Sequence, residues 1–250
     1  MSEVTKEEAA GKRVKEVIPL RGVRKIVAEH MLRSLQVSAQ LTNTGMMDMT
    51  EMVKLRQSLL SQEKTTGIHF TYTDLFVKVV AQALSQHPLL NSSLIDNEIK
   101  VWEDINVGIA LAFKLREGGS GLIVPVVRNA DKKSLEEIHQ VVRDLTERGR
   151  NVKLLPDDVS GGTFTITNVG VFGAGGRVIT GFGTPIINQP EVAILGTMPI
   201  VDTPVVREGQ IVIRPMMNYN LTYDHRVVMG EDAARFMATL QQLMEEPELL

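Results

Sequence analysis

His225 has the surroundings most suited to chemistry among the five histidines of the chain. It lies in the segment TYDHRVVMGEDAARF, at the end of an alternating run and just before a helix that starts at a glycine. Its place in the alternation matches Tyr219, Leu221 and Tyr223, the apolar face of the predicted strand. An imidazole that faces inward at a strand end can be desolvated, neutral and oriented, as a general base must be. A buried core histidine whose ring nitrogens are hydrogen-bonded explains the local pattern equally well.

A second group of polar residues lies in the segment GGTFTITNVG at 161–170. Alternation places Thr165 and Thr167 on one face of a predicted strand, with Phe164 and Ile166 on the other. A hydroxyl held in this way can donate a hydrogen bond to an oxyanion in acyl transfer. A solvent-facing row of threonines is the simpler interpretation of this segment taken alone.

Other candidate motifs are rejected on their context. GAGG at 173–176 is followed by no Lys-Ser/Thr and does not meet the GxGxxG pattern after a first strand, so it predicts neither a phosphate loop nor a dinucleotide site. The pair Lys132-Lys133 slightly resembles a lipoylated lysine, but it opens a predicted helix and not a hairpin tip. Structural or surface roles are expected for the other histidines, which lack partners at metal-ligand spacing: His30, His69, His87 and His139.

The elements that position these residues follow from periodicity and caps. Thr50 and Thr73 are predicted N-caps of two helices, and Pro88 ends the second. The predicted helices are 22–37, 50–62, 73–87, 134–150 and 231–245, the last with Ala234, Met237, Leu240 and Met244 facing inward; the predicted strands are 105–112, 122–127, 163–168, 191–197, 204–206, 211–213 and 217–223. Because strands do not alternate regularly with helices, we expect an α+β fold with a large mixed sheet.

Composition excludes several classes of function. The 250 residues include no cysteine, which removes disulfides, thiolate nucleophiles and cysteine-based metal sites. Charge is nearly balanced, with 27 Lys and Arg against 30 Asp and Glu, so nucleic acid and anionic membranes are not expected partners. No signal sequence or membrane span is recognised, and a cytoplasmic protein is expected. Residues 1–17 are predicted to be a disordered tail or the remnant of a linker.

The blocks RGVRKIVAEHM, HPLLNSSL, INVGIAL, GLIVPVVRNADKKSLEEI, GGTFTITNVG, PIINQPEVAILG and YDHRVVMGEDAARF occur in this order over residues 18–250. Together they resemble the catalytic domain of the dihydrolipoamide acyltransferases of 2-oxo acid dehydrogenase complexes. The resemblance implies the fold of chloramphenicol acetyltransferase and a homotrimer with an active-site channel at each subunit interface. It also implies coenzyme A as a substrate, a lipoyl group supplied in trans, no metal, and a larger cubic or dodecahedral core with other complex components as partners.

The resemblance also implies roles for particular residues. His225 matches the family's base, which deprotonates a thiol that then attacks a thioester carbonyl. Thr167 matches a Ser or Thr hydroxyl that stabilises the oxyanion from the neighbouring subunit, and Arg24 matches an Arg that pairs with a carboxylate near the base. The Asn-x-Ser stretch near the coenzyme A end of the channel is matched by Asn91, Ser92 and Ser93.

The sequence departs from the family pattern in three respects. Met229 replaces the Asp of the motif His-x-x-x-Asp-Gly, and the loop at 113–121 is longer than usual. The third departure is that residues 1–17 contain no lipoyl or subunit-binding domain, so the acyl carrier is expected on a missing domain or on another chain. The leading hypothesis is acyl transfer between dihydrolipoamide and coenzyme A, with activity that Met229 can reduce. A catalytically weakened core-forming scaffold and a coenzyme A-dependent acyltransferase with another acceptor remain the alternatives.

Overall fold

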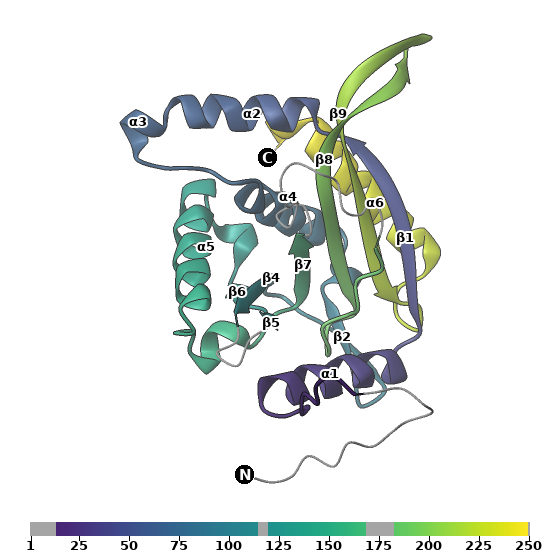
Figure 1. Cartoon of the computed structure of the whole chain (residues 1–250). Helices are drawn as coiled ribbons and strands as arrows, with labels where there is room; N and C mark the ends of the chain where they lie inside the picture. The colour runs from purple at the N-terminus through teal and green to yellow at the C-terminus, as the bar shows by residue number, and fades with distance from the viewer. Residues whose placement is uncertain (1–13, 115–119, 169–182, 250) are drawn as a thin grey trace.

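The computed structural model describes residues 14–114, 120–168 and 183–249, and the predicted fold class is confirmed. Over these ranges seven strands form one mixed sheet in the order β1-β9-β8-β7-β4-β5, with β6 paired to β4 (Figure 1). Its strands are β1 (Gln40–Asp48), β4 (Val107–Lys114), β5 (Ser120–Ile123), β6 (Val126–Val127), β7 (Phe164–Asn168), β8 (Ala193–Arg207) and β9 (Gln210–Asp224). A separate hairpin pairs β2 (Ser92–Ile95) with β3 (Glu98–Val101).

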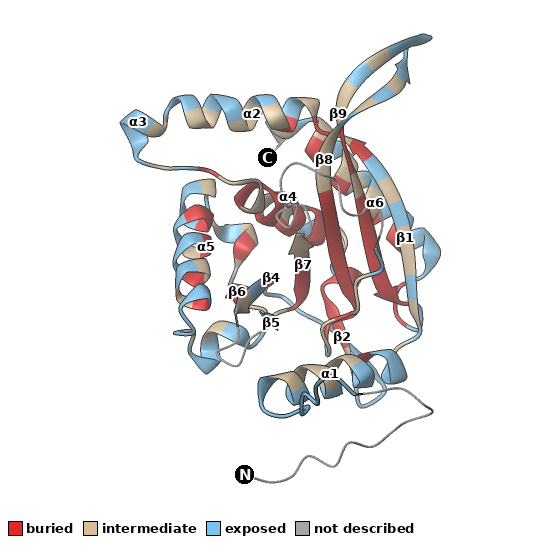
Figure 2. Cartoon of the chain, in the orientation of Figure 1, coloured by how far each residue is buried: buried red, intermediate tan, exposed pale blue. Residues whose placement is uncertain are grey.

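Helices cover the sheet and enclose the core, which Figure 2 shows as a buried centre around α4 and the long strands. The helices are α1 (Val23–Val37), α2 (Thr50–Ser61), α3 (Glu63–Thr66), α4 (Tyr72–Gln86), α5 (Leu135–Arg150) and α6 (Gly230–Glu245), and short 3-10 turns span Pro88–Leu90, Ala130–Lys132, Pro156–Val159 and Pro247–Leu249. Nine of the fifteen side chains of α4 are buried, as expected for the central helix. No helix in the described ranges is long and apolar enough to cross a membrane.

The two faces of β7 are used differently. Phe164 and Ile166 are buried in the core, and the Phe164 ring lies 5.8 Å from that of Phe236 on α6. Thr165 and Thr167 therefore point to the opposite face, away from α6. Figure 1 shows α1 at the end of the molecule, apart from α2, α4 and α6. The threonine face is thus the part of the sheet that remains for a site.

Helix ends follow local signals, with two corrections. Thr50 is the first residue of α2 and not its N-cap, which is Met49. Ser134, with which the predicted helix 134–150 begins, is the N-cap of α5 and forms a capping box with Glu137. Thr73 is not the cap of α4: Thr71 is extended, and its hydroxyl accepts from the backbone N–H of Asp74, whose carboxylate bonds back to Thr71. Asp74, three positions after Thr71, completes this capping box and so makes Thr71, and not Thr73, the N-cap.

The strand predictions need larger corrections. β1 was not expected because Gln40–Asp48 is polar and mostly part-exposed, and its strand character comes from antiparallel pairing with β9. The short strands predicted from 191 to 223 are parts of the two fifteen-residue strands β8 and β9. On α6 the predicted inward residue Ala234 is exposed, and the buried side is formed by Ala233, Phe236, Leu240, Leu243 and Met244.

Candidate active site

His225 lies directly after the last residue of β9. Its backbone N–H donates to the carbonyl of Ala39 at 2.9 Å, and its ring centroid lies 5.8 Å from that of Tyr223. The chain turns here, because the N–H groups of Val227 and Val228 bond to the carbonyl of Asp224. The alternation of the strand therefore ends before His225, and its side chain is exposed in the single chain. The described residues of its own chain therefore do not shield the imidazole from water, as was expected for a base.

The backbone that carries His225 is held by an ion pair between the buried Asp224 and the exposed Arg226, which the sequence analysis missed. Asp224 is 2% exposed and accepts hydrogen bonds from the N–H of Ala39 and from the backbone and guanidinium of Arg226. Burial alone would raise the pKa of Asp224, but the hydrogen bonds from Arg226 and Ala39 outweigh it and hold that pKa below its usual value. Asp224 and Arg226 flank His225 in the sequence, and these opposite charges were the signal that could have revealed the ion pair. This pair fixes the turn that presents the imidazole.

Thr167 stands in a mostly apolar pocket on the threonine face of the sheet. Its strand neighbours are Ala110 on β4 and Gly196 on β8, and its side chain is part-buried. The pocket has a volume of about 320 Å³ and is lined by Met31, Ala110, Leu122, Val124, Thr165, Thr167, Gly183, Thr184, Pro185, Ile186, Asn188, Ile194, Gly196 and Met198. A hydroxyl in such surroundings meets little competition from water, which strengthens any hydrogen bond that it donates.

His225 and Thr167 are not brought together within one chain. The register places Thr167 beside Gly196, and Gly196 opposite Asn220 on β9. Thr167 is therefore level with Asn220 but two strands away from it, and His225 follows Asn220 by five residues along β9. At about 3.3 Å per residue and about 4.8 Å between strands, their backbones are roughly 19 Å apart. One chain alone cannot place both groups on one carbonyl.

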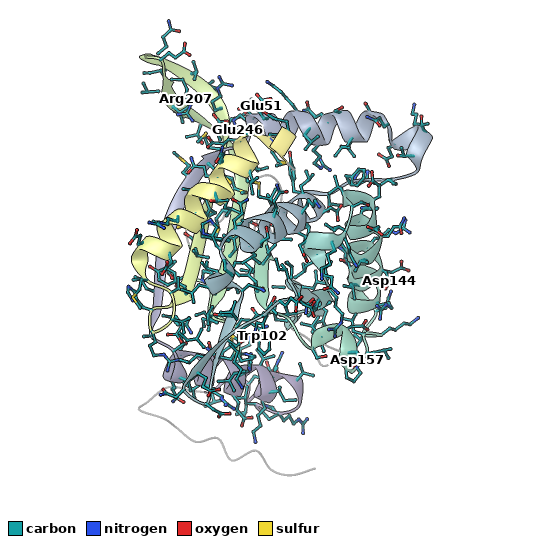
Figure 3. All side chains as sticks on the ribbon, turned by 180° about the vertical axis from the view of Figure 1, so that it is seen from behind. Glu51, Trp102, Asp144, Asp157, Arg207 and Glu246 are labelled. Atoms are coloured by element: carbon teal, nitrogen blue, oxygen red, sulfur yellow. The ribbon has the colours of Figure 1, made fainter. Side chains whose placement is uncertain are left out.

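The predicted coenzyme A residues are buried and bonded within the chain. Asn91, Ser92 and Ser93 are each at most 2% exposed. The Asn91 amide donates to the carbonyls of Trp102 and Asp104, and the Trp102 indole, labelled in Figure 3, donates to the Ser93 hydroxyl at 3.0 Å. These bonds fix the start of the β2–β3 hairpin to the segment that follows it at 102–104. Contact with coenzyme A stays a prediction.

Met229 and Arg24 lie on different helices. Met229 is the N-cap residue of α6, is 47% exposed, and donates its backbone N–H to the Asp232 carboxylate at 3.1 Å. Arg24 is half-buried in the first turn of α1. These positions do not test the catalytic roles of Met229 and Arg24, so both roles stay predictions. The GAGG segment and the centre of the loop at 113–121 lie outside the described residues.

Comparison with known proteins identifies the family. The family described as 2-oxoacid dehydrogenases acyltransferase (catalytic domain) matches residues 12–250. The chain belongs to this family. It is 36% identical over 234 residues to the dihydrolipoyllysine-residue succinyltransferase component of the 2-oxoglutarate dehydrogenase complex of Haemophilus influenzae, covering 93% of this chain and 54% of the relative. It is 40% identical over 230 residues to the lipoamide acyltransferase component of the branched-chain alpha-keto acid dehydrogenase complex of Bacillus subtilis, covering 91% and 52%.

Solved structures of acyltransferase domains agree with this family assignment. The dihydrolipoamide acetyltransferase of Azotobacter vinelandii superposes with a TM-score of 0.85 at 32% identity, covering 94% of this chain and 93% of that one. The cubic core of a pyruvate dehydrogenase multienzyme complex gives 0.87 at 31%, covering 100% and 99%. A chloramphenicol acetyltransferase gives 0.50 at 13%, covering 92% and 100%, which confirms the fold expected from the sequence. The acyltransferase chain spans about half the length of the curated relatives it matches.

Proposed function

We propose that this acyltransferase domain moves an acyl group between dihydrolipoamide, carried on a separate domain or chain, and coenzyme A. The imidazole of His225 removes the proton from the attacking thiol, and the thiolate adds to the thioester carbonyl. The hydroxyl of Thr167 donates to the oxyanion that forms. Collapse of this intermediate breaks the old carbon–sulfur bond, and the leaving thiolate takes the proton back from the imidazolium. One thioester replaces another, so the reaction is reversible.

The separation of His225 and Thr167 within one chain is the observation that carries this proposal. It supports a site built from two subunits of a homotrimer, with the base from one chain and the oxyanion donor from the next. An interfacial site also accounts for the exposure of His225, because the neighbouring chain would exclude water from the imidazole. The mostly apolar pocket beside Thr167 suits an aliphatic thioester.

The Azotobacter relative supports the choice of residues. Its structural and enzymatic investigation concerns a serine, a histidine and an asparagine in the catalytic mechanism, with the asparagine four positions after the histidine. Met229 has the same spacing from His225 and supplies neither the amide of that relative nor a carboxylate. We propose that transfer activity is retained here and is limited by Met229. Arg24 as the partner of a carboxylate near the base, and Asn91, Ser92 and Ser93 beside coenzyme A, belong to the same proposal.

The partners follow from the same relatives. The relatives that this chain resembles are named as components of 2-oxoglutarate and branched-chain alpha-keto acid dehydrogenase complexes, and one solved structure is the cubic core of a pyruvate dehydrogenase complex. We propose that trimers of this domain assemble into a larger core that receives lipoyl-bearing carriers, in the cytoplasm.

A coenzyme A-dependent assay tests the proposal directly. The purified chain is mixed with free dihydrolipoamide and with acetyl, succinyl or branched-chain acyl-coenzyme A, and release of coenzyme A is followed. Transfer that requires His225 supports the proposal. A trimer that transfers no acyl group to dihydrolipoamide favours the scaffold, and transfer only to another acceptor favours the third hypothesis.

A further inference from the structure

Glu191 is a buried carboxyl group behind the wall of the Thr167 pocket. It lies just before β8 and is 2% exposed. Its Oε2 accepts from the hydroxyl of Thr165 at 2.7 Å, and its Oε1 accepts from the amide of Asn188 at 3.0 Å. A Cβ at position 162 would lie 3.0 Å from Oε1, so the glycine there leaves the space that the carboxyl group occupies.

The two groups that bind Glu191 are themselves part of the pocket wall. Thr165 and Asn188 line the pocket, and Thr165 precedes Thr167 by two residues on the same face of β7. The amide oxygen of Asn188 pairs with Nε2 of His30 at 3.0 Å, which ties the network to α1. The carboxyl group thus joins β7 to the 188–191 segment directly, and α1 joins the network through Asn188. The polar side of the pocket depends on these bonds.

We propose that Glu191 is a positioning residue for acyl transfer: through Thr165 and Asn188 it fixes the polar side of the pocket in which Thr167 stands. This inference rests on the proposed function, because it assigns a task only if Thr167 serves an oxyanion. Glu191 itself touches no substrate. Its contribution is to hold the hydroxyl-bearing strand and the Asn188 loop in one arrangement.

The protonation state of Glu191 gives this role a measurable signature. Burial raises the pKa of Glu191 to about 8, although the hydrogen bonds from Thr165 and Asn188 act in the opposite direction. The group is therefore neutral at pH 7. When it ionises, a buried negative charge appears on the side of the pocket where the oxyanion forms, and the two repel each other. Transfer should weaken as Glu191 loses its proton.

Charged groups on neighbouring elements do not supply a competing explanation. His30 on α1, Arg128 after β6 and Asp224 at the end of β9 lie on elements around Glu191. Three more charged side chains line a pocket with the preceding residues Gln189 and Pro190: Arg33, Asp96 and Arg226. None of these described residues contributes to the shift of the Glu191 pKa, which has burial and the two hydrogen bonds as its causes.

The test compares Glu191→Gln and Glu191→Ala with wild type in the trimeric chain, with kcat and KM measured from about pH 6 to about pH 10. Wild type should lose kcat above about pH 8, and Glu191→Gln should keep most of its kcat at pH 7 and lack this decline. Glu191→Ala should lose about 10- to 100-fold in kcat with little change in KM, since it leaves the pocket wall unsupported. Asp74→Asn is the control, because Asp74 is a buried carboxylate of α4 that is bonded to Thr71 and to His139 on α5, and none of these three residues lines the pocket; it should keep the alkaline decline.

Thr165→Val provides a second route if the Glu191 variants fold poorly, because valine keeps the shape of threonine and removes the hydroxyl that joins Glu191 to the pocket. It should lower kcat and shift the alkaline decline. An alkaline decline that persists unchanged in Glu191→Gln and Thr165→Val overturns the inference. So does a Glu191→Ala chain with normal kcat and lowered thermal stability alone.

Failure of the inference can be told from failure of the proposed function. If wild type transfers no acyl group to dihydrolipoamide, both the proposed function and the positioning role of Glu191 are contradicted. If wild type is active and depends on His225 but is indifferent to Glu191, only the inference falls. Infrared difference spectra of wild type against Glu191→Gln, taken on either side of pH 8, report the protonated carboxyl band without any turnover. Absence of that band below pH 8 also contradicts the inference.

Discussion

His225 and Thr167 lie roughly 19 Å apart in one chain, since Thr167 is level with Asn220 whereas His225 follows the end of β9. A general base and an oxyanion donor act on the same carbonyl and must lie within a few ångström of it. The separation is set by the register of a continuous sheet, so no side-chain rotation removes it. A second chain has to supply the missing group.

Mixing inactive variants tests this arrangement. Trimers assembled from equal amounts of His225→Ala and Thr167→Ala chains contain interfaces that join an intact base to an intact hydroxyl. Random assembly gives about one quarter of the wild-type sites, so about one quarter of the activity should return. Each variant alone supplies the background. Activity that stays at that background after unfolding and joint refolding, or full activity in a monomer, contradicts the interfacial site.

Removal of the base should have a large effect on turnover. His225→Ala should lower kcat by ~10²–10⁴-fold, because the thiol then ionises without a positioned acceptor. The side chain is exposed in the single chain, and the backbone N–H that bonds to Ala39 is kept, so folding should be unaffected. Steady-state kinetics and circular dichroism measure the two effects. Turnover close to wild type would make His225 structural.

Removal of the pocket hydroxyl should have a smaller effect. Thr167→Ala should lose on the order of 10²-fold in kcat, the usual effect of one oxyanion donor. Thr167→Ser restores the hydroxyl and should recover most of the loss, which separates hydrogen bonding from packing. KM should change little in both variants. A Ser variant as impaired as the Ala variant would point to the methyl group and not to the hydroxyl.

Met229 gives a prediction with separable effects on stability and activity. As the N-cap of α6 it has no side-chain oxygen for the helix N–H groups, so Met229→Asn and Met229→Asp should each stabilise the fold by about 1 kcal/mol. Asp should gain less stability than Asn, because Glu231 and Asp232 already carry negative charge in the first turn. Both variants should also raise kcat when assayed far below the melting temperature. Gains in stability without any gain in kcat would favour the scaffold hypothesis.

Glu191 should make stability depend on pH in a defined direction. Burial raises its pKa from 4.5 to about 8, so between these values the folded chain keeps a proton that the unfolded chain releases. The unfolded state then binds fewer protons, and stability falls as the pH rises through this window. Gln has no such proton, so the melting temperature of Glu191→Gln relative to wild type should be higher at pH 8 than at pH 5. A constant difference would contradict the buried neutral carboxyl.

The local features of this chain could be read from the sequence. The helix at Val23–Val37, the Ser134 cap of α5 and the two faces of β7 depend on neighbours within a few residues, and those neighbours are visible in the sequence. The family was likewise visible, because its ordered blocks preserve types and spacing that no single element requires.

Tertiary structure decided the features that depend on distant partners. β1 is a strand because β9 pairs with it from far along the chain, and polar side chains such as those of Gln40 and Asn43 give no period-2 signal of burial. The inward orientation expected for His225 failed because the turn after Asp224 ends the alternation one residue earlier. The burial of Glu191 could not be predicted from its sequence neighbours, because burial depends on how the whole chain folds. The sequence determines which groups can react, while register and packing determine which of them can meet.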